Sequence, residues 1–486
     1  MNTTLLAFCS RFGKPLICSL QVGLLLLASG RAWAWDAATT HAGMTERTLS
    51  ASKFHAVLAH QLGRALGPFE PLKLDANAID ADALRALKSR LDTLDPAGGY
   101  RPTADGVLTA LGWVKAGAVL AKTPPELGRH HFFEPGRRTG LDDGAGLAGT
   151  VHAARLTLGS GATVRDAATG TAFDLEGMPA TEWLRAPQND LGLQAFFDNW
   201  QLAVSAKEPS HRETALVRSL LALGGVLSVL EDMGQPAFVR NDFRGEFQDR
   251  GSEFEEFVAD RYGSVALPRA AAPVSRPDLE SFFVAADGRG LAQATQQRFF
   301  SRGTLPRDFT CVPGDRPDEA ARLVNQSLKF AEPKLDLLDL RPSEQTRYVI
   351  REGAKIAAYR RVADKIHFFF DEEVYADVAQ AWLPQVMGYA AGLTDHLLRG
   401  KLQIVVSGDE ATLTVSGISE NLDVDAAVHV FREEEAGARR EVAVVPLRRG
   451  ASVTVPLPKG TNKIAAFARG RDSSGIFVAT GELTLP

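Results

Sequence analysis

Cysteine is scarce in this sequence. Only three cysteines occur in 486 residues, and two of them, Cys9 and Cys18, lie in an N-terminal stretch that is expected to be removed. Cys311 then remains alone. A chain with a single cysteine has no internal disulfide bond, so its stability must come from packing or from a bound metal.

An excess of positive charge is also missing. The chain has 54 lysine and arginine residues against 59 aspartate and glutamate residues, which gives a formal net charge of -5. Removal of a leader would take away Arg11, Lys14 and Arg31 and make the balance more acidic still. Proteins that hold nucleic acid without sequence preference carry the opposite charge, so no nucleic-acid partner is expected.

No stretch after the N-terminus looks like a membrane span. At the N-terminus an apolar run at residues 16–28 follows two basic residues and precedes Ala32-Trp33-Ala34. A basic start, an apolar middle and an A-x-A end are typical of a secretory signal peptide. Residues 1–34 are therefore predicted to be a signal peptide, and the protein to be secreted or periplasmic. The alternative is a retained membrane anchor, for which this run is short.

Apolar residues are otherwise plentiful. They make up 45% of the chain, which over this length is enough for more than one buried core. Residues 35–400 are predicted to form a mainly α-helical domain, with a β-rich insertion at about 137–209 and helices again at 317–399. Residues 401–486 change to a period of two and predict about seven short strands, which indicates an all-β sandwich.

The helical domain is organised around residues 220–243. A capping box at Ser210 and Glu213 predicts the start of an apolar helix that ends at a Gly-Gln-Pro break. Ser228 and Asp232 lie four residues apart near its end and therefore share one face. A carboxylate on an apolar helix stays buried only if cations or a metal compensate its charge. Asp232 is therefore the first candidate for a functional residue.

The segment around Asp232 resembles the bacterial zinc-dependent phospholipases C, a family that includes alpha-toxin and is related to zinc-dependent single-strand nucleases. The family pattern is H-x-x-x-D-x-x-x-P-x-H, and here its positions are Ser228, Asp232, Pro236 and Phe238. The bridging aspartate is kept and both flanking histidines are replaced. The resemblance implies a phospholipase C-like domain in which Asp232 is a metal ligand and the candidate catalytic residue.

Two further stretches resemble ligand segments of the same family. Cleavage after Ala34 would leave Trp35 as the first residue, whose free amine and carbonyl can chelate a metal, and His41 follows in a T-H-x-x-x-T pattern. His131 opens the sequence His-Phe-Phe-Glu-Pro, which resembles the family's H-F-[FYW]-[DE]-P. No aspartate precedes it in residues 113–129, where the family supplies one. The alternative for His131 is a polar residue beside a turn.

Glu255 has two explanations. Its surroundings resemble the family pattern H-x-x-[FY]-E-x-[FW]-[AV], in which the histidine and glutamate bind a metal, but Gly251 stands at the histidine position. Ser252 and Glu255 also form a capping box, which accounts for Glu255 without any metal. The capping box is the preferred explanation.

The resemblance thus implies five metal-binding residues, which are Trp35, His41, His131, Asp232 and Glu255. Ligand counting favours about one zinc ion, at Trp35, His41 and Asp232, because only this set reaches the three or four ligands that zinc requires. The expected function is a secreted, weakly active, zinc-dependent hydrolase of phospholipid or another phosphoester. The alternative is a catalytically silent relative that binds a lipid, a glycan or a protein. A nuclease is the least expected function because the chain is acidic.

Residues 401–486 also resemble, in layout only, the β-sandwich that some toxins of this family carry. That domain binds calcium and membrane, so the resemblance implies a peripheral membrane contact. Asp423 and Asp425, or Asp472, could bind calcium in loops of this domain. Acidic loop residues are usually solvated, which is the simpler explanation for all three.

Overall fold

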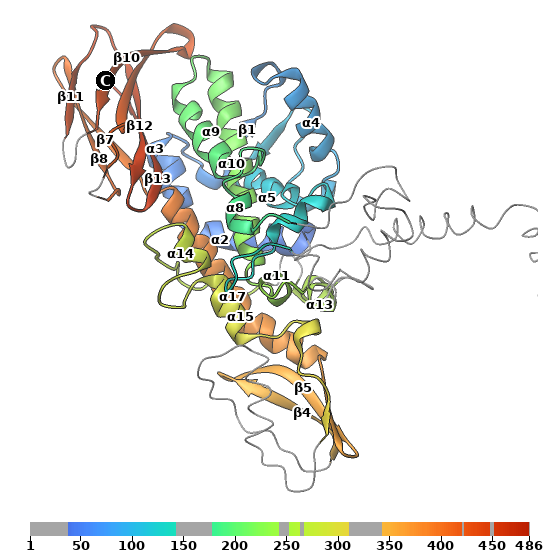
Figure 1. Ribbon diagram of the computed structural model, residues 1–486. Coiled ribbons are helices and arrows are strands. Elements are labelled where there is room, and N and C mark those ends of the chain that lie inside the picture. Colours follow the sequence, from blue (N-terminus) through green and yellow to red (C-terminus); the bar gives the residue numbers. More distant parts are fainter. Residues whose placement is uncertain are drawn as a thin grey trace, which may run out of the picture.

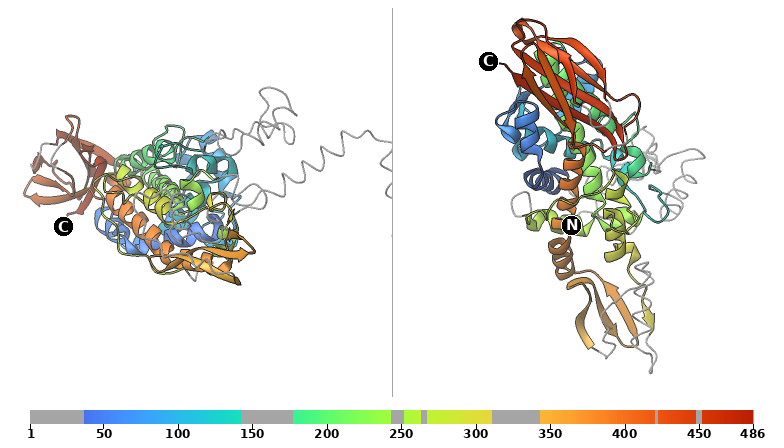
Figure 2. Two further views of the ribbon diagram at one scale, coloured as in Figure 1. Left: turned by 60° about the horizontal axis from the view of Figure 1, so that its bottom comes forward. Right: turned by 90° about the vertical axis from the view of Figure 1, so that its left-hand side faces the viewer.

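The computed structural model describes residues 37–141, 177–242, 252–262, 267–310, 343–419, 422–447 and 452–485. Within these ranges a mainly helical domain is followed by a C-terminal all-β domain, as the sequence predicts. Figures 1 and 2 show the β domain at one end of the molecule and a small second sheet at the other, with the helices between them. The predicted signal peptide and Trp35 lie outside the described residues.

The helical domain is built around α10, the 24-residue helix Pro209–Asp232. Every residue from Thr214 to its end is buried except Arg218. α10 packs against α5 (Ala110–Leu120), α9 (Leu193–Ser205) and α17 (Glu372–Leu397). By length and composition α10 could cross a membrane, but 89% of its most apolar stretch is buried inside the protein. α10 is therefore a core helix, which is apolar on all sides for that reason.

Shorter elements surround this core. The other described helices are η1 Ala37–His41, α2 Ala42–Ala51, α3 Phe54–Gln61, η2 Gly67–Phe69, η3 Ala76–Ala78, α4 Ala81–Leu91, η4 Pro96–Gly98, η5 Pro125–His131, α8 Ala180–Trp183, α11 Pro236–Val239, α13 Glu253–Tyr262, α14 Glu280–Phe283, α15 Leu291–Arg298 and η6 Arg302–Thr304. β1 (Pro71–Lys73) and β2 (Val107–Thr109) form a two-stranded antiparallel sheet.

The start of α10 differs from the predicted capping box. The helix begins at Pro209, and Glu208 is its N-cap without a side-chain hydrogen bond. Proline suits the first turn because its missing N–H group would have no partner there. The Glu213 carboxylate accepts a hydrogen bond from the backbone N–H of Lys73 at 2.9 Å, which ties α10 to β1.

Two glycines let α5 and α10 cross at very short range. A Cβ atom on Gly117 would lie 1.9 Å from the carbonyl oxygen of Leu221, and one on Gly224 would lie 2.0 Å from that of Val114. Only glycine leaves room for such an approach. The crossing brings the segment that follows α5 within reach of the end of α10.

Residues 343–369 form strands, so the helical prediction for residues 317–399 is wrong there. β4 (Ser343–Arg351), β5 (Ala354–Val362) and β6 (Lys365–Phe369) pair antiparallel, and β3 (Phe309–Thr310) adds to β6. Along β6 the buried residues Ile366 and Phe368 alternate with exposed ones. Such a period of two is the signal of a half-buried strand. Within this region the helical prediction holds for α17, and residues 311–342 lie outside the described residues.

The insertion predicted at about 137–209 falls partly on residues 142–176, which lie outside the described residues. Its later part is helical and consists of α8 and α9. α9 buries Phe196, Phe197 and Trp200 in the main core. This part therefore belongs to the helical core and does not merely cover it.

The described residues of the C-terminal domain form seven strands in the order β10-β9-β12-β13-β7-β8-β11. Their bounds are β7 Lys401–Ser407, β8 Glu410–Ser416, β9 Ala427–Glu433, β10 Arg439–Pro446, β11 Val453–Pro456, β12 Lys463–Asp472 and β13 Gly475–Thr484, with η7 (Glu435–Gly437) between β9 and β10. Neighbouring strands are antiparallel except β13 and β7. Leu413, Val428 and Phe477 are among the residues of a core that belongs to this domain alone. The predicted β-sandwich is confirmed.

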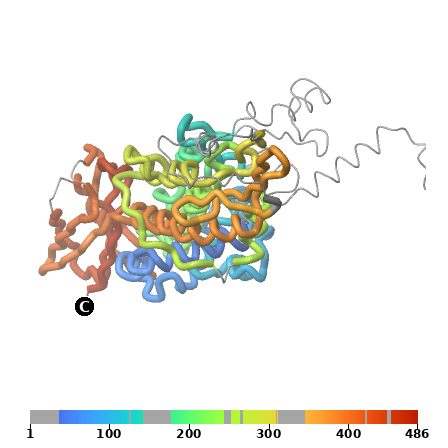
Figure 3. Tube along the Cα trace, turned by 90° about the horizontal axis from the view of Figure 1, so that it is seen from below, coloured from blue at the N-terminus to red at the C-terminus, as the bar shows by residue number. Residues whose placement is uncertain are grey.

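Strand β12 is buried on both faces. Ile464 and Ala466 lie in the core of the β-sandwich, whereas Ala465 and Phe467 lie in the core of the helical domain. Successive side chains of a strand point to opposite faces, which makes this division possible. Helix α9 packs against β12 and β13, and Figure 3 shows the sandwich lying against one side of the helices. Strand β12 therefore contributes side chains to the cores of both domains.

Candidate functional site

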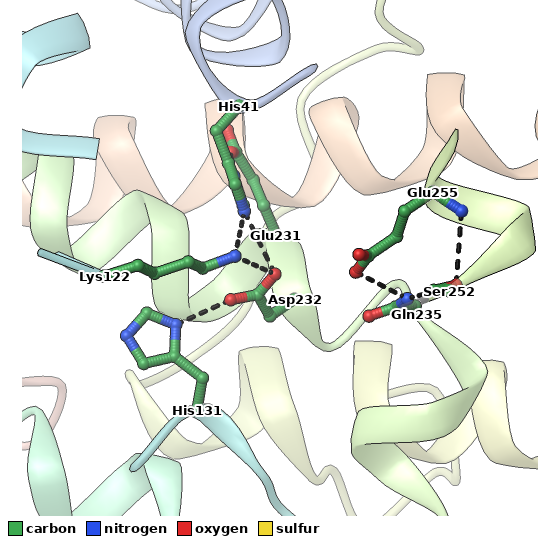
Figure 4. A network of polar contacts seen from close by, with 8 residues as sticks. All are labelled: His41, Lys122, His131, Glu231, Asp232, Gln235, Ser252 and Glu255. Carbon is green, nitrogen blue, oxygen red and sulfur yellow. Dashed lines mark hydrogen bonds and ion pairs between the residues drawn. The ribbon is translucent and has the colours of Figure 1, made fainter. Parts of the chain in front are cut away.

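Asp232, His41 and Lys122 meet at the end of α10 (Figure 4). Asp232 is the last residue of α10, His41 is the last residue of η1, and Lys122 follows α5. His41 and Asp232 are 0% exposed and Lys122 is 7% exposed. Three segments that are far apart in the sequence therefore bring an imidazole, a carboxylate and an ammonium group together away from water.

The Lys122 ammonium lies between the other two groups. Its Nζ is 2.6 Å from Nε2 of His41 and 2.9 Å from Oδ1 of Asp232. An ammonium group can only donate, so Nε2 of His41 accepts from Lys122. Burial lowers the pKa of His41, but the charge of Asp232 and the hydrogen bonds to Asp232 and Glu231 raise it overall. Nδ1 donates to Oε2 of Glu231 at 2.6 Å. The Nε2 lone pair, which is the part of the ring that binds metals, therefore faces Lys122.

His131 holds the other oxygen of Asp232. Nδ1 of His131 donates to Oδ2 of Asp232 at 2.6 Å, and its Nε2 is buried without a hydrogen-bond partner among the described residues. The segment after His131 is fixed to α11 because the backbone N–H of Phe133 donates to the carbonyl oxygen of Phe238 at 3.1 Å. The structure thus brings together three of the five residues that the sequence singles out, namely His41, His131 and Asp232.

Burial and charge have opposite effects on the pKa of Asp232. Burial alone would raise this pKa, but the Lys122 ammonium, followed by His41 and the hydrogen bond from His131, holds it well below its usual range. Burial lowers the pKa of His131, so its ring is neutral, and burial raises the pKa of Glu231. Asp232 is therefore the ionised partner of Lys122 at the centre of the cluster.

The two positions where the resemblance expects histidine carry other side chains. Phe238 is buried and stacks on Phe132 with the ring centroids 4.2 Å apart. Nζ of Lys122 lies 5.8 Å from the Phe238 centroid. Ser228 is buried one turn before Asp232, and its Oγ has no hydrogen-bond partner within the described ranges. An aromatic ring and a short hydroxyl thus replace two potential ligands.

Glu255 lies in a second buried cluster, apart from the first (Figure 4). Its Oε1 accepts from Nε2 of Gln235 at 2.8 Å, and its backbone N–H donates to Oγ of Ser252 at 3.2 Å. The second bond is the serine half of the predicted capping box, at the start of α13. The carboxylate therefore receives an amide donor where the resemblance implies a metal, and Gly251 lies outside the described residues.

A metal ion does not fit the first cluster in this arrangement. Zinc in proteins usually has four ligands, and no three His, Cys, Asp or Glu side chains in the described part of the chain are placed to hold a metal. The ligand atoms that come closest, Nε2 of His41 and Oδ1 of Asp232, are bound to the Lys122 ammonium. Trp35 lies outside the described residues, so its role in a zinc site stays a prediction.

Lys122 and Glu231 are two residues of the cluster that no sequence pattern singles out. Lys122 stands at a helix end before Thr-Pro-Pro, where a lysine is usually solvated. Charge balance is the signal that could have indicated it, because Asp232 is a carboxylate on an apolar helix and requires a cation. A search of residues 113–129 for a cation as well as for an acid would have identified Lys122, Lys115 and Arg129 as candidates.

Asp472, a calcium candidate of the β-sandwich, is engaged by protein donors. Its carboxylate accepts from Nη2 of Arg399 at 2.9 Å and from the backbone N–H groups of Ser419 and Ser474 at 2.8 and 2.9 Å. These bonds hold the β12–β13 turn to the end of α17. They account for the burial of this carboxylate without a calcium ion.

No protein-family model and no curated protein matches the chain. Among solved structures, the alpha-toxin of Clostridium perfringens from avian strain SWCP is similar, with 11% identity, 94% of this chain and 99% of the toxin covered, and a TM-score of 0.23. The alpha toxin of Clostridium absonum is also 11% identical, with coverages of 92% and 98% and a TM-score of 0.25. Such TM-scores are too low to support an argument about function.

Proposed function

We propose that this protein is exported, that its helical domain does not hydrolyse phosphoesters, and that the protein serves for binding. The observation that carries this proposal is the position of Lys122 between His41 and Asp232. A hydrolytic metal lowers the pKa of a bound water molecule and clamps the phosphate oxygens. An ammonium group has no coordination position for water and offers only hydrogen bonds.

The burial of the cluster supports the same proposal. His41, His131 and Asp232 are all 0% exposed. A general base or a nucleophile must come within hydrogen-bonding distance of its substrate. The stacked rings of Phe132 and Phe238 lie beside Lys122 and would have to move before a phosphodiester could reach Asp232.

A weakly active, zinc-dependent phosphodiesterase is the second candidate. The observation in its favour is the convergence of three potential ligands, because His41 and His131 approach the two oxygens of Asp232 to 3.0 and 2.6 Å. If Trp35 is the mature N-terminus, its amine and carbonyl would add two donors. Zinc could bind only if the Lys122 side chain left, so zinc and Lys122 exclude each other.

Hydrolysis assays distinguish the two candidates. The secreted chain, with its N-terminus checked by intact mass, is tested on bis(p-nitrophenyl) phosphate and on phosphatidylcholine, with and without added zinc. We expect no more turnover from the wild type than from Asp232→Asn. The hydrolase would be favoured by turnover that a chelator abolishes. Asp232→Asn should then lose this turnover, and a variant of the exposed Asp82 should keep it.

A phospholipid surface is the proposed binding partner, through the β-sandwich. Val405, Val424 and Val444 are exposed on this domain, and Val424 between β8 and β9 is 94% exposed. Exposed apolar side chains can enter the headgroup region of a bilayer. The wild type should sediment together with phospholipid vesicles, and clearly less Val424→Asp protein should be found in the vesicle pellet. Absence of co-sedimentation would reject the lipid partner and leave a glycan or a protein.

A further inference from the structure

We infer that Lys122 is a permanent internal cation that takes the position of a divalent metal ion between His41 and Asp232, and that a short neutral residue at position 122 would turn the cluster into a metal site. This inference concerns the same cluster as the proposed function. Its test measures metal content and stability, so it can fail or succeed independently of any result on hydrolysis.

The two acceptor atoms have nearly the spacing of metal ligands. Nε2 of His41 and Oδ1 of Asp232 are 3.0 Å apart. Two ligand atoms of a tetrahedral zinc ion with bonds of about 2.0 Å are about 3.3 Å apart. The Lys122 ammonium lies against both atoms, at 2.6 Å from Nε2 and 2.9 Å from Oδ1. A cation in contact with both atoms stabilises their close approach, and the Lys122 ammonium is that cation.

The ammonium is held in place by the fold. The Lys122 side chain is 6% exposed, and its ammonium lies beside the ring of Phe238. The close crossing of α5 and α10 at Gly117 and Gly224 fixes the position of the segment after α5 that carries Lys122. To reach water, the side chain would have to give up two hydrogen bonds to His41 and Asp232. Lys122 is therefore a fixed part of the cluster, whereas a metal ion can exchange.

The atoms that accept hydrogen bonds from the Lys122 ammonium are of the kinds that bind zinc. They are an imidazole nitrogen of His41 and a carboxylate oxygen of Asp232, with His131 bound to the second carboxylate oxygen. Imidazole and carboxylate are common zinc ligands, and water can complete the set. Truncation of Lys122 to alanine removes the competing cation and leaves space, whereas methionine removes the charge and keeps the space filled.

Elemental analysis of the full mature chain after zinc loading and dialysis tests the inference. We expect no retained zinc in the wild type or in Lys122→Met and about one zinc ion per chain in Lys122→Ala, which Asp232→Asn should remove again. Lys115→Ala is the matched control, because Lys115 lies on α5 and pairs with the half-exposed Glu46 at 2.9 Å, outside the cluster. Cobalt in Lys122→Ala should give the visible bands of a tetrahedral site.

Two results would overturn the inference. One is stoichiometric zinc in the wild type that His41→Ala loses, and the other is a folded Lys122→Ala variant that takes up neither zinc nor cobalt. If Lys122→Ala does not fold, the wild type still decides the matter. A chelator should leave its melting temperature unchanged, and a clear fall on chelation would show that a metal, not Lys122, compensates Asp232.

Discussion

Asp232 and Lys122 form an ion pair that is almost completely shielded from water. In such a pair, loss of one partner is costly because the other remains as an uncompensated buried charge, whereas loss of both is far less harmful. The imidazole groups of His41 and His131 add hydrogen bonds to this pair. The stability of the whole cluster should therefore depend on this one pair.

Lys122→Met and Asp232→Asn are each expected to lower the free energy of unfolding by about 3–5 kcal/mol. The double variant should lose less than the sum of the two, by about 1–3 kcal/mol. Urea unfolding of the four proteins at neutral pH measures this coupling. The partly exposed pair Lys115–Glu46 is the control and should couple by less than about 1 kcal/mol. Additive losses at Lys122 and Asp232 would contradict the central role of the pair.

His396 lies in the last turn of α17 and is expected to make the stability of the protein sensitive to acid. Burial, helped by the nearby Arg399, lowers its pKa to about 4. The unfolded chain binds this proton near pH 6.5, so the contribution of the neutral ring is present above about pH 6.5 and is lost as the pH falls toward 4. When the pH falls from 7 to 4.5, the free energy of unfolding should therefore decrease by about 2 kcal/mol less in His396→Gln than in the wild type. Urea unfolding at the two pH values measures this difference. Equal losses in both proteins would contradict this pKa.

At the residue scale, the sequence indicates the acid of the cluster better than its cation. Asp232 is conspicuous because a charge interrupts an apolar helix, and His41 and His131 lie in recognisable segments. Lys122 gives no such signal, because the helical spacing of residues near it says nothing about a partner 110 residues away. Its role follows from the crossing of two helices, which no local pattern encodes.

At the scale of elements, the crossing of α5 and α10 is the feature that places the cluster. Gly224→Ala should lower the free energy of unfolding by about 3 kcal/mol, because its Cβ would lie 2.0 Å from the oxygen of Val114 and 2.6 Å from the nitrogen of Ala118. Arg218→Ala, an exposed change on the same helix, should stay within about 0.5 kcal/mol. Thermal or urea unfolding compares the two. A neutral Gly224→Ala would show that the helices can move apart freely.

Elements whose hydrophobic residues follow a clear helical or strand period can be predicted from this sequence, and elements with a mixed pattern cannot. The core helix α10 and the strands after residue 400 follow their patterns. Strands β4 to β6 do not, because β5 buries four consecutive residues, Ala357 and Ala358 among them. A continuous apolar run fits a buried strand and a buried helix equally well. The pairing of β5 between β4 and β6 decides the matter, and that pairing is a tertiary property.

At the scale of the whole molecule, the domains are predicted to unfold together. Ala465, Phe467 and Val478 lie in the helical core although they belong to the C-terminal sheet. Arg469 adds a polar tie, since its Nη2 lies 2.7 Å from Oδ1 of Asp198 on α9. Scanning calorimetry of the full chain should therefore show one transition, and a chain that ends at residue 400 should be insoluble or lack a cooperative transition. Two well-separated transitions, or a stable shortened chain, would contradict this prediction.

The position of β12 near the end of the chain also has a consequence for biosynthesis. A polypeptide emerges from the ribosome with its N-terminus first, so the helices are complete long before the strands that cover α9 have been made. Until then the apolar surface of α9 has no cover from β12 and β13 and needs protection from aggregation. A premature stop codon before β12 would therefore leave α9 without this cover and destabilise the helical domain as well.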